Sequence, residues 1–80
     1  MEALDGNAVA GALYEHFGVE MTTAHGACGH CGTRSVVAEL AVYDRAPGAV
    51  IRCRACGEVV MVVVEIRGQV AVHDRQFTLS

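Results

Sequence analysis

The spacing of apolar residues near the N-terminus predicts a helix. Val9, Leu13 and Phe17 recur at intervals of four residues, which places them on one stripe of a helical surface. Asp5 suits the N-cap of this helix, and Gly18 suits the left-handed position that follows its last turn. We therefore expect a helix over about residues 5–17 that packs through Leu13 and Phe17 on the strands that follow it.

The remainder of the chain, about residues 22–79, has the pattern of an antiparallel β-ribbon. Ala46-Pro47-Gly48 predicts a turn, since proline presets one turn position and glycine tolerates the next. Gly68-Gln69 predicts a second turn. Between and around these turns we expect strands at residues 35–43 (SVVAELAVY), 49–52, 58–66 (EVVMVVVEI) and 70–73, with a further short strand at 77–79.

The expected strand at residues 58–66 is apolar on both faces. Alternation places four aliphatic residues, Val60, Val62, Val64 and Ile66, on one face, and it places Val59, Met61 and Val63 on the other. The helix can cover only one face, and we expect the Met61 face to be left bare. Either residues 70–79 fold back over it or two copies pair as a symmetric homodimer. The few apolar residues in VHDRQFTLS favour the homodimer.

Four cysteines carry the clearest chemical signal. Cys28, Cys31, Cys53 and Cys56 give the spacing C-x2-C-x21-C-x2-C, which is close to that of a zinc site built from two knuckles. Gly32 and Gly57 follow the second cysteine of each pair, where a tight knuckle commonly requires positive φ. Four thiolates suit one tetrahedral zinc ion and leave no open position for a substrate. We therefore expect a structural zinc site with these four ligands.

Other uses of the cysteines fit the sequence less well. A redox dithiol would need one CxxC beside a βαβ pattern, whereas this chain has two, each placed before a strand. Iron can use the same four ligands and stays a minor alternative to zinc. His25 and His30 lie near the first pair, but four cysteines already complete the coordination. The chain has no H-x-E element and no nucleophile motif, so we expect it not to be an enzyme.

Chain length, composition and charge limit the expected number of domains, the location of the protein and its partners. An 80-residue chain builds only a small core, so one domain over 1–80, stabilised by a metal, is expected. The chain opens with no secretory signal, which predicts a cytoplasmic location, and no apolar run is long enough to cross a membrane. A formal charge of −3 makes nucleic acid an unlikely partner. No small-molecule substrate is indicated.

Three arginines lie close to the cysteines in the sequence, and they allow two interpretations. Arg34, Arg52 and Arg54 could contact phosphates, as in some nucleic-acid-binding ribbons. They could instead offset the charge of the metal centre, because Zn²⁺ and four thiolates sum to 2 − 4 = −2. The acidic balance of the chain favours the second interpretation.

The knuckles CGHCG and CRACG resemble those of the zinc-ribbon class. The chain also resembles a family of small actinobacterial proteins with no assigned activity, through LDGNAVAGAL, FGVEMT and the two knuckles around AVYDRAPGAVIRC. This resemblance covers most of the chain up to about Val64. It implies that the four cysteines are ligands and implies nothing about the task.

These observations predict a small α+β zinc ribbon whose N-terminal helix packs on an antiparallel sheet. The expected function is a structural zinc-binding module that acts as a protein-interaction or adaptor domain, with a homodimer or another protein as partner. The alternative is a nucleic-acid or transcription-associated ribbon that uses Arg34, Arg52 and Arg54.

Overall fold

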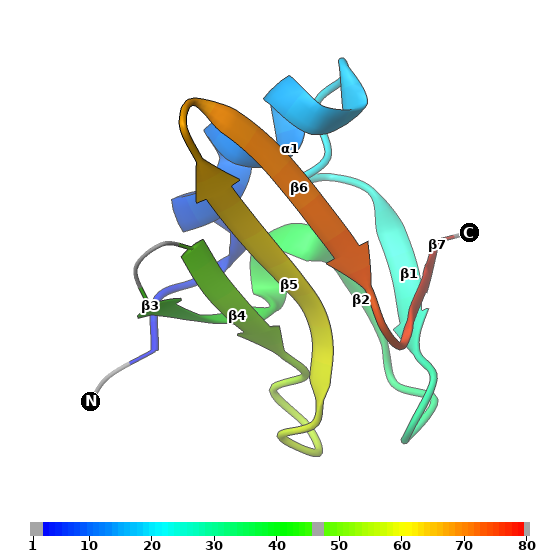
Figure 1. Cartoon of the computed structure of the whole chain (residues 1–80). Coiled ribbons are helices and arrows are strands. Elements are labelled where there is room, and N and C mark those ends of the chain that lie inside the picture. The colour runs from blue at the N-terminus through cyan, green and yellow to red at the C-terminus, as the bar shows by residue number, and fades with distance from the viewer. Residues whose placement is uncertain (1–2, 46–47, 80) are drawn as a thin grey trace.

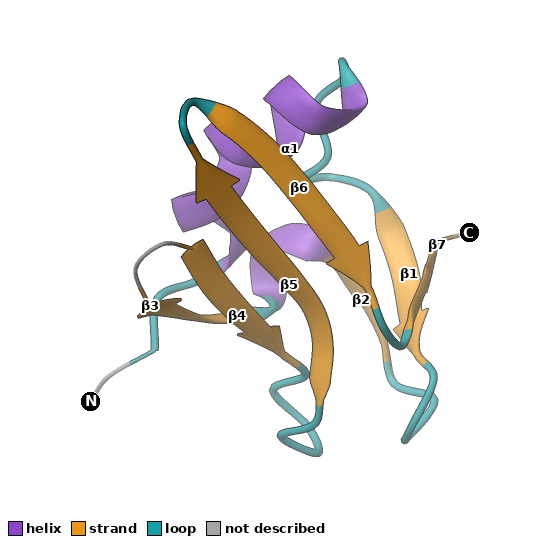
Figure 2. Cartoon of the chain, viewed as in Figure 1, coloured by secondary structure: helices purple, strands orange, loops and turns teal. Residues whose placement is uncertain are grey.

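The computed structural model describes residues 3–45 and 48–79, which form a small α+β fold with two antiparallel sheets (Figures 1 and 2). The larger sheet has the strand order β3-β4-β5-β6, and the smaller has the order β2-β1-β7. The helix and the smaller sheet lie on the same side of the larger sheet (Figure 1). In chain order the elements are η1 (Gly6–Val9), α1 (Ala10–Phe17), β1 (His25–Cys28), β2 (Arg34–Val36), η2 (Val37–Glu39), β3 (Ala41–Arg45), β4 (Gly48–Arg52), β5 (Val59–Ile66), β6 (Gln69–Asp74) and β7 (Phe77–Leu79).

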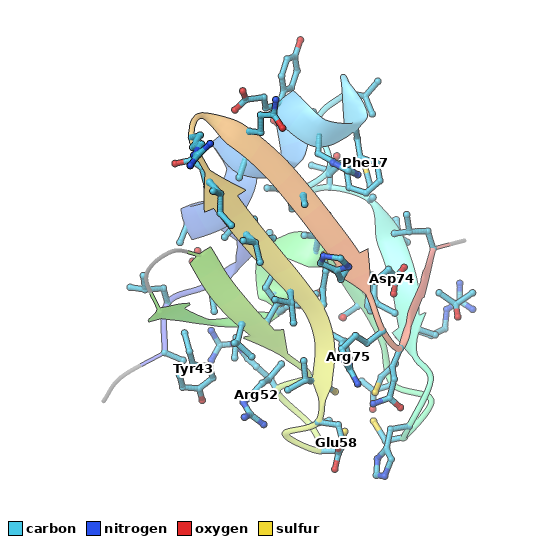
Figure 3. All side chains as sticks on the ribbon, in the orientation of Figure 1. Phe17, Tyr43, Arg52, Glu58, Asp74 and Arg75 are labelled. Carbon is cyan, nitrogen blue, oxygen red and sulfur yellow. The ribbon has the colours of Figure 1, made fainter. Side chains whose placement is uncertain are left out.

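The predicted N-terminal helix is present, although its first turn is a 3₁₀ turn. The Asp5 carboxylate accepts a hydrogen bond from the Asn7 backbone N–H, and Gly18 ends α1 with a φ of 77°. Leu13 is buried and packs in the core, as expected. The prediction for Phe17 is wrong, because this side chain is 40% exposed. The last turn of α1 projects past β6, so Phe17 has no strand beneath it (Figures 1 and 3).

The single strand predicted at residues 35–43 is two strands in different sheets. β2 and β3 are separated by the 3₁₀ turn η2, in which the Leu40 N–H donates to the Val37 carbonyl at 3.1 Å. The Glu39 carboxylate closes the turn by accepting from the Val36 N–H at 3.0 Å. Val37 and Leu40 are both buried, a spacing of three that a continuous strand cannot bury on one face. The turn therefore moves the chain from the smaller sheet to the larger one.

The two predicted hairpins are confirmed. β3 pairs with β4 from Ala41↔Arg52 to Arg45↔Gly48, and β5 pairs with β6 from Met61↔Asp74 to Ile66↔Gln69. Of the predicted turn Ala46-Pro47-Gly48, the first two residues lie outside the described part of the chain, and Gly48 begins β4. The second turn is formed by Arg67 and Gly68, both with positive φ, one residue earlier than expected.

The face of β5 that was expected to be bare is the buried one. Met61 and Val63 are 2% and 3% exposed, whereas Ile66 on the other face is 56% exposed. The covering residues come from η1, α1, η2 and β7 of the same chain, and Phe77 from the C-terminal segment is among them. Val60 is also buried, because the register between β4 and β5 shifts beside Ile51 and Arg52. Burial of the Met61 face therefore needs no second copy.

The described helices include none with the length and apolar character that a membrane crossing would need.

Candidate metal centre

Two hairpin junctions bring the four cysteines together. Cys28 ends β1 and Cys31 lies in the loop to β2, whereas Cys53 directly follows β4 and Cys56 lies in the loop to β5. In Figure 1 these two loops lie side by side at the lower end of the molecule. The sheets thus present one knuckle each to the same point in space, although the knuckles are far apart in the sequence.

The two knuckles have the same backbone geometry. In the first, the Cys28 N–H donates to Thr33 O at 2.9 Å and the Gly32 N–H donates to Cys28 O at 2.8 Å. In the second, the Cys53 N–H donates to Glu58 O at 3.0 Å and the Gly57 N–H donates to Cys53 O at 2.8 Å. Gly32 and Gly57 have φ values of 78° and 79°, which confirms that both glycines occupy the left-handed region.

Two of the distances between the sulfur atoms match those around a single tetrahedral ion, and the widest separation would have to close by about 1 Å when the ion binds. Cys28 Sγ lies 3.7 Å from Cys56 Sγ, Cys31 Sγ lies 3.7 Å from Cys53 Sγ, and all four sulfurs lie within 4.8 Å of one another. Thiolates placed about 2.3 Å from a tetrahedral zinc ion are separated by about 3.8 Å. A disulfide would need about 2.05 Å between sulfurs, and all four cysteines are free thiols in this structure.

Two thiols of the cluster have pKa values displaced in opposite directions. The hydroxyl and backbone of Thr33 lower the pKa of the Cys31 thiol to about 6. At Cys56 the backbone contact with Glu58 lowers the pKa, but desolvation and the neighbouring cysteines outweigh it and raise the pKa to about 12. Four thiolates this close repel one another, so a bound cation is what would allow all four to ionise.

The cluster is open to solvent on one side. Cys28 and Cys53, the first cysteine of each knuckle, are 3% and 4% exposed, whereas Cys31 is exposed and Cys56 is half-buried. The His30 N–H points to Cys28 Sγ at 3.4 Å, which is a backbone contact of the kind that supports a thiolate ligand. The first knuckle thus supplies a backbone donor as well as two sulfurs.

Arg52 and Arg54, which lie near the cysteines, contact backbone carbonyls. Arg52 Nη1 donates to Gly57 O at 2.8 Å, which ties the end of β4 to the second knuckle, and the Arg52 guanidinium lies 5.9 Å from the centre of the Tyr43 ring. Arg54 donates to Glu39 O at 2.8 Å and to Leu4 O at 3.3 Å. Arg34 begins β2 and lines, with Arg54 and Cys53, a hollow beside the cluster.

The histidines near the first knuckle are not part of the cluster. Among the described residues, the group whose ligand atoms could share one ion consists of the four cysteines. His30 is an exposed residue in the middle of the knuckle, and His25 begins β1. Sequence reasoning missed Thr33, whose hydroxyl lies 3.2 Å from Cys31 Sγ. Its position directly after CxxCG is the one signal that the sequence offers for this role.

Comparison with known proteins identifies a family for the chain. The model of a family described as a family of unknown function (DUF6510) matches residues 1–79. Comparisons with the curated proteins and with the solved structures found no match.

Proposed function

The chain belongs to the DUF6510 family of unknown function. Because the family assigns no function, we propose one from the chain's own residues, namely a structural zinc-binding module. The module is a small zinc ribbon that serves protein interaction as an adaptor domain. The observation that carries the proposal is the convergence of Cys28, Cys31, Cys53 and Cys56 from two knuckles of matching geometry. One zinc ion bound there would join the two sheets through their loops.

A structural role follows from the ligand set. Four thiolates complete a tetrahedral zinc ion, so no position is left at which a substrate or a water molecule could be activated. We therefore propose that the protein is not an enzyme. The site also needs its thiols reduced, a condition that the cytoplasm provides and the secretory route does not.

Elemental analysis of purified protein and of two variants tests the metal site. The parent protein should contain one zinc ion per chain, and Cys53→Ser should lose most of it because a buried thiolate ligand is removed. The matched control is His30→Ala in the neighbouring loop, which should keep the zinc. Iron would be recognised by its visible thiolate-to-iron absorption, and loss of metal in His30→Ala would reassign the ligands.

A nucleic-acid ribbon that uses Arg34, Arg52 and Arg54 is the second candidate, because Arg34 and Arg54 line one hollow beside the cluster. Two observations support the structural role instead. Arg52 and Arg54 already donate to backbone carbonyls, and the chain carries a formal charge of −3. Few phosphates can be neutralised by three arginines, so we expect no binding to a short duplex or single strand at physiological salt. Salt-resistant submicromolar binding in a fluorescence anisotropy titration would favour the second candidate.

A further inference from the structure

The four-stranded sheet has an outward face made of aliphatic side chains. The strand register aligns Tyr43, Val50, Val62 and His73 in one row across the sheet, followed by a row of Gly48, Val64 and Ala71 and a row of Ile66 and Gln69. The alternate rows contain Ile51, Met61 and Val63, which are buried in the core. The first set of rows therefore faces away from the core.

No described element covers this outward face. In Figures 1 and 2, α1, η2 and the smaller sheet all lie behind the larger sheet, and nothing lies in front of β4, β5 and β6. Val50, Val62 and Val64 are half-buried by their neighbours, and Ile66 is 56% exposed. Beside the β5–β6 turn the face is hollowed, with Val64, Ile66, Arg67, Gln69 and Ala71 lining about 420 Å³.

The charged side chains at the described outward register positions and in the β5–β6 turn are basic. Arg52 and Arg67 lie at its two ends, next to the second knuckle and in the β5–β6 turn. None of the outward register positions is an Asp or Glu, although the chain has nine acidic residues and six basic ones. Glu65 and Asp74, which belong to the same strands, hold positions in the opposite rows. The outward face is therefore apolar in its centre and cationic at its ends.

We propose that this outward face binds an amphipathic helix of another protein, which is apolar on the side toward the sheet and acidic at its flanks. The inference rests on the proposed adaptor function and names the chemistry of its partner. β5 has eight residues and spans about 25 Å, which a helix of about 17 residues matches. Acidic residues near both ends of such a helix would meet Arg67 and the exposed guanidinium of Arg52, which donates to Gly57 O through Nη1 and has further N–H groups to offer.

Charge and composition argue against the other occupants of this face. Two copies packed face to face would bring Arg52 and Arg67 of both chains to one interface whose described outward register positions include no Asp or Glu to pair with them. A nucleic acid would need exposed rings for stacking, but the centre of the face is aliphatic and the Tyr43 ring has Arg52 over it (Figure 3). An acidic amphipathic helix satisfies both the apolar centre and the cationic ends.

A designed peptide of about 18 residues, with leucine along one helical stripe and glutamate elsewhere, is the probe. Zinc-loaded protein is titrated with it to millimolar peptide while the backbone amide shifts are followed. We expect changes confined to β4, β5, β6 and the Arg67 turn. A peptide with lysine in place of glutamate should produce none. No change at millimolar peptide, equal changes with the lysine peptide, or changes centred on α1 would overturn the proposal. Shifts that depend on protein concentration alone would assign the face to a second copy and also overturn it.

Two variants and a matched control locate the interaction. Ile66→Glu and Arg67→Glu should each weaken peptide binding by about tenfold, because one removes exposed apolar area and the other reverses a charge that the peptide meets. The matched control is Glu65→Lys. Glu65 lies in β5 next to Ile66 but in a row that alternates with the outward rows, so this substitution should leave the peptide affinity unchanged or raise it slightly. Zinc content is measured in each variant. One zinc per chain with no peptide binding would reject this inference and leave the metal site standing, whereas absence of zinc would reject the proposed function itself.

Discussion

At the scale of single residues, Gly26 shows why this fold requires particular side chains. It lies in β1 opposite Leu79 of β7 and is buried. A β-carbon built on it would overlap the ring of Phe77 and lie 2.9 Å from the carbonyl oxygen of Thr78. Phe77 is 2% exposed and is one of the largest fully buried side chains. Glycine at position 26 therefore lets the C-terminal strand bring an aromatic ring into the core.

We expect Gly26→Ala to lower the free energy of unfolding by about 1–3 kcal/mol, because the added methyl group must displace the Phe77 ring or the β7 backbone. The control is Gly11→Ala in α1, where a β-carbon meets nothing within 4 Å. That substitution should stabilise the protein by about 0.5–1 kcal/mol, since alanine favours a helix. Urea denaturation of both variants compares them. A Gly26→Ala protein as stable as its parent would contradict the packing described for Phe77.

The same scale explains why the clustering of the four cysteines was the easiest part of the candidate site to predict. A CxxCG knuckle is specified by residues that are adjacent in the sequence, and its glycine reports the backbone conformation directly. The convergence of the two knuckles follows from their repetition. The role of Thr33 was missed, because a hydroxyl beside a cysteine has many ordinary explanations in a sequence.

At the scale of elements, prediction succeeded for segments that carry a local sequence pattern. It failed for segments whose structure is determined by pairing or packing with other parts of the chain. The N-terminal helix and both hairpins have local signals and are present. Strand β1 (His25–Cys28) was missed, since its sequence HGAC contains no β-branched or aromatic residue and its pairing is set by β2 and β7. The break at η2 was hidden in an apolar run that reads equally well as one strand.

The buried face of β5 could have been found from its partner strand. Both faces of β5 are apolar, so the strand alone cannot decide between them. In β6, however, Val70 and Val72 alternate with Gln69, Ala71 and His73, and the register pairs Val72 with Val63. Directly paired residues share a face of the sheet, so the alternation in β6 identifies the Met61 and Val63 face as the core side.

The helix α1 supports a prediction at this scale. Leu13→Asp should lower the free energy of unfolding by about 3 kcal/mol or more, because Leu13 is 1% exposed and a carboxylate there would be buried without a partner. Tyr14→Asp is the matched control, since the adjacent side chain is 56% exposed and should change stability by only about 0.5 kcal/mol. Thermal unfolding monitored by circular dichroism separates the two. Equal stability of the variants would mean that α1 does not contribute to the core.

At the scale of the whole molecule, the two knuckles bring one end of each sheet to the same place. The first knuckle belongs to the β1–β2 hairpin of the smaller sheet and the second to the β4–β5 hairpin of the larger sheet. A chain of 80 residues buries a limited apolar surface, and the core formed around Met61, Ile51 and Phe77 is correspondingly small. The free energy of metal binding in a site of this kind is on the order of 10 kcal/mol, comparable with the whole stability of a small domain.

Thermal unfolding of the metal-loaded protein, with and without excess chelator, is the most direct test that the four cysteines hold a zinc ion on which the fold depends. Our account predicts a cooperative transition in the loaded protein, with one zinc ion per chain. Chelator should abolish the transition, and added zinc under reducing conditions should restore it. A protein that contains no metal, or that melts cooperatively at the same temperature in the presence of chelator, would contradict the account.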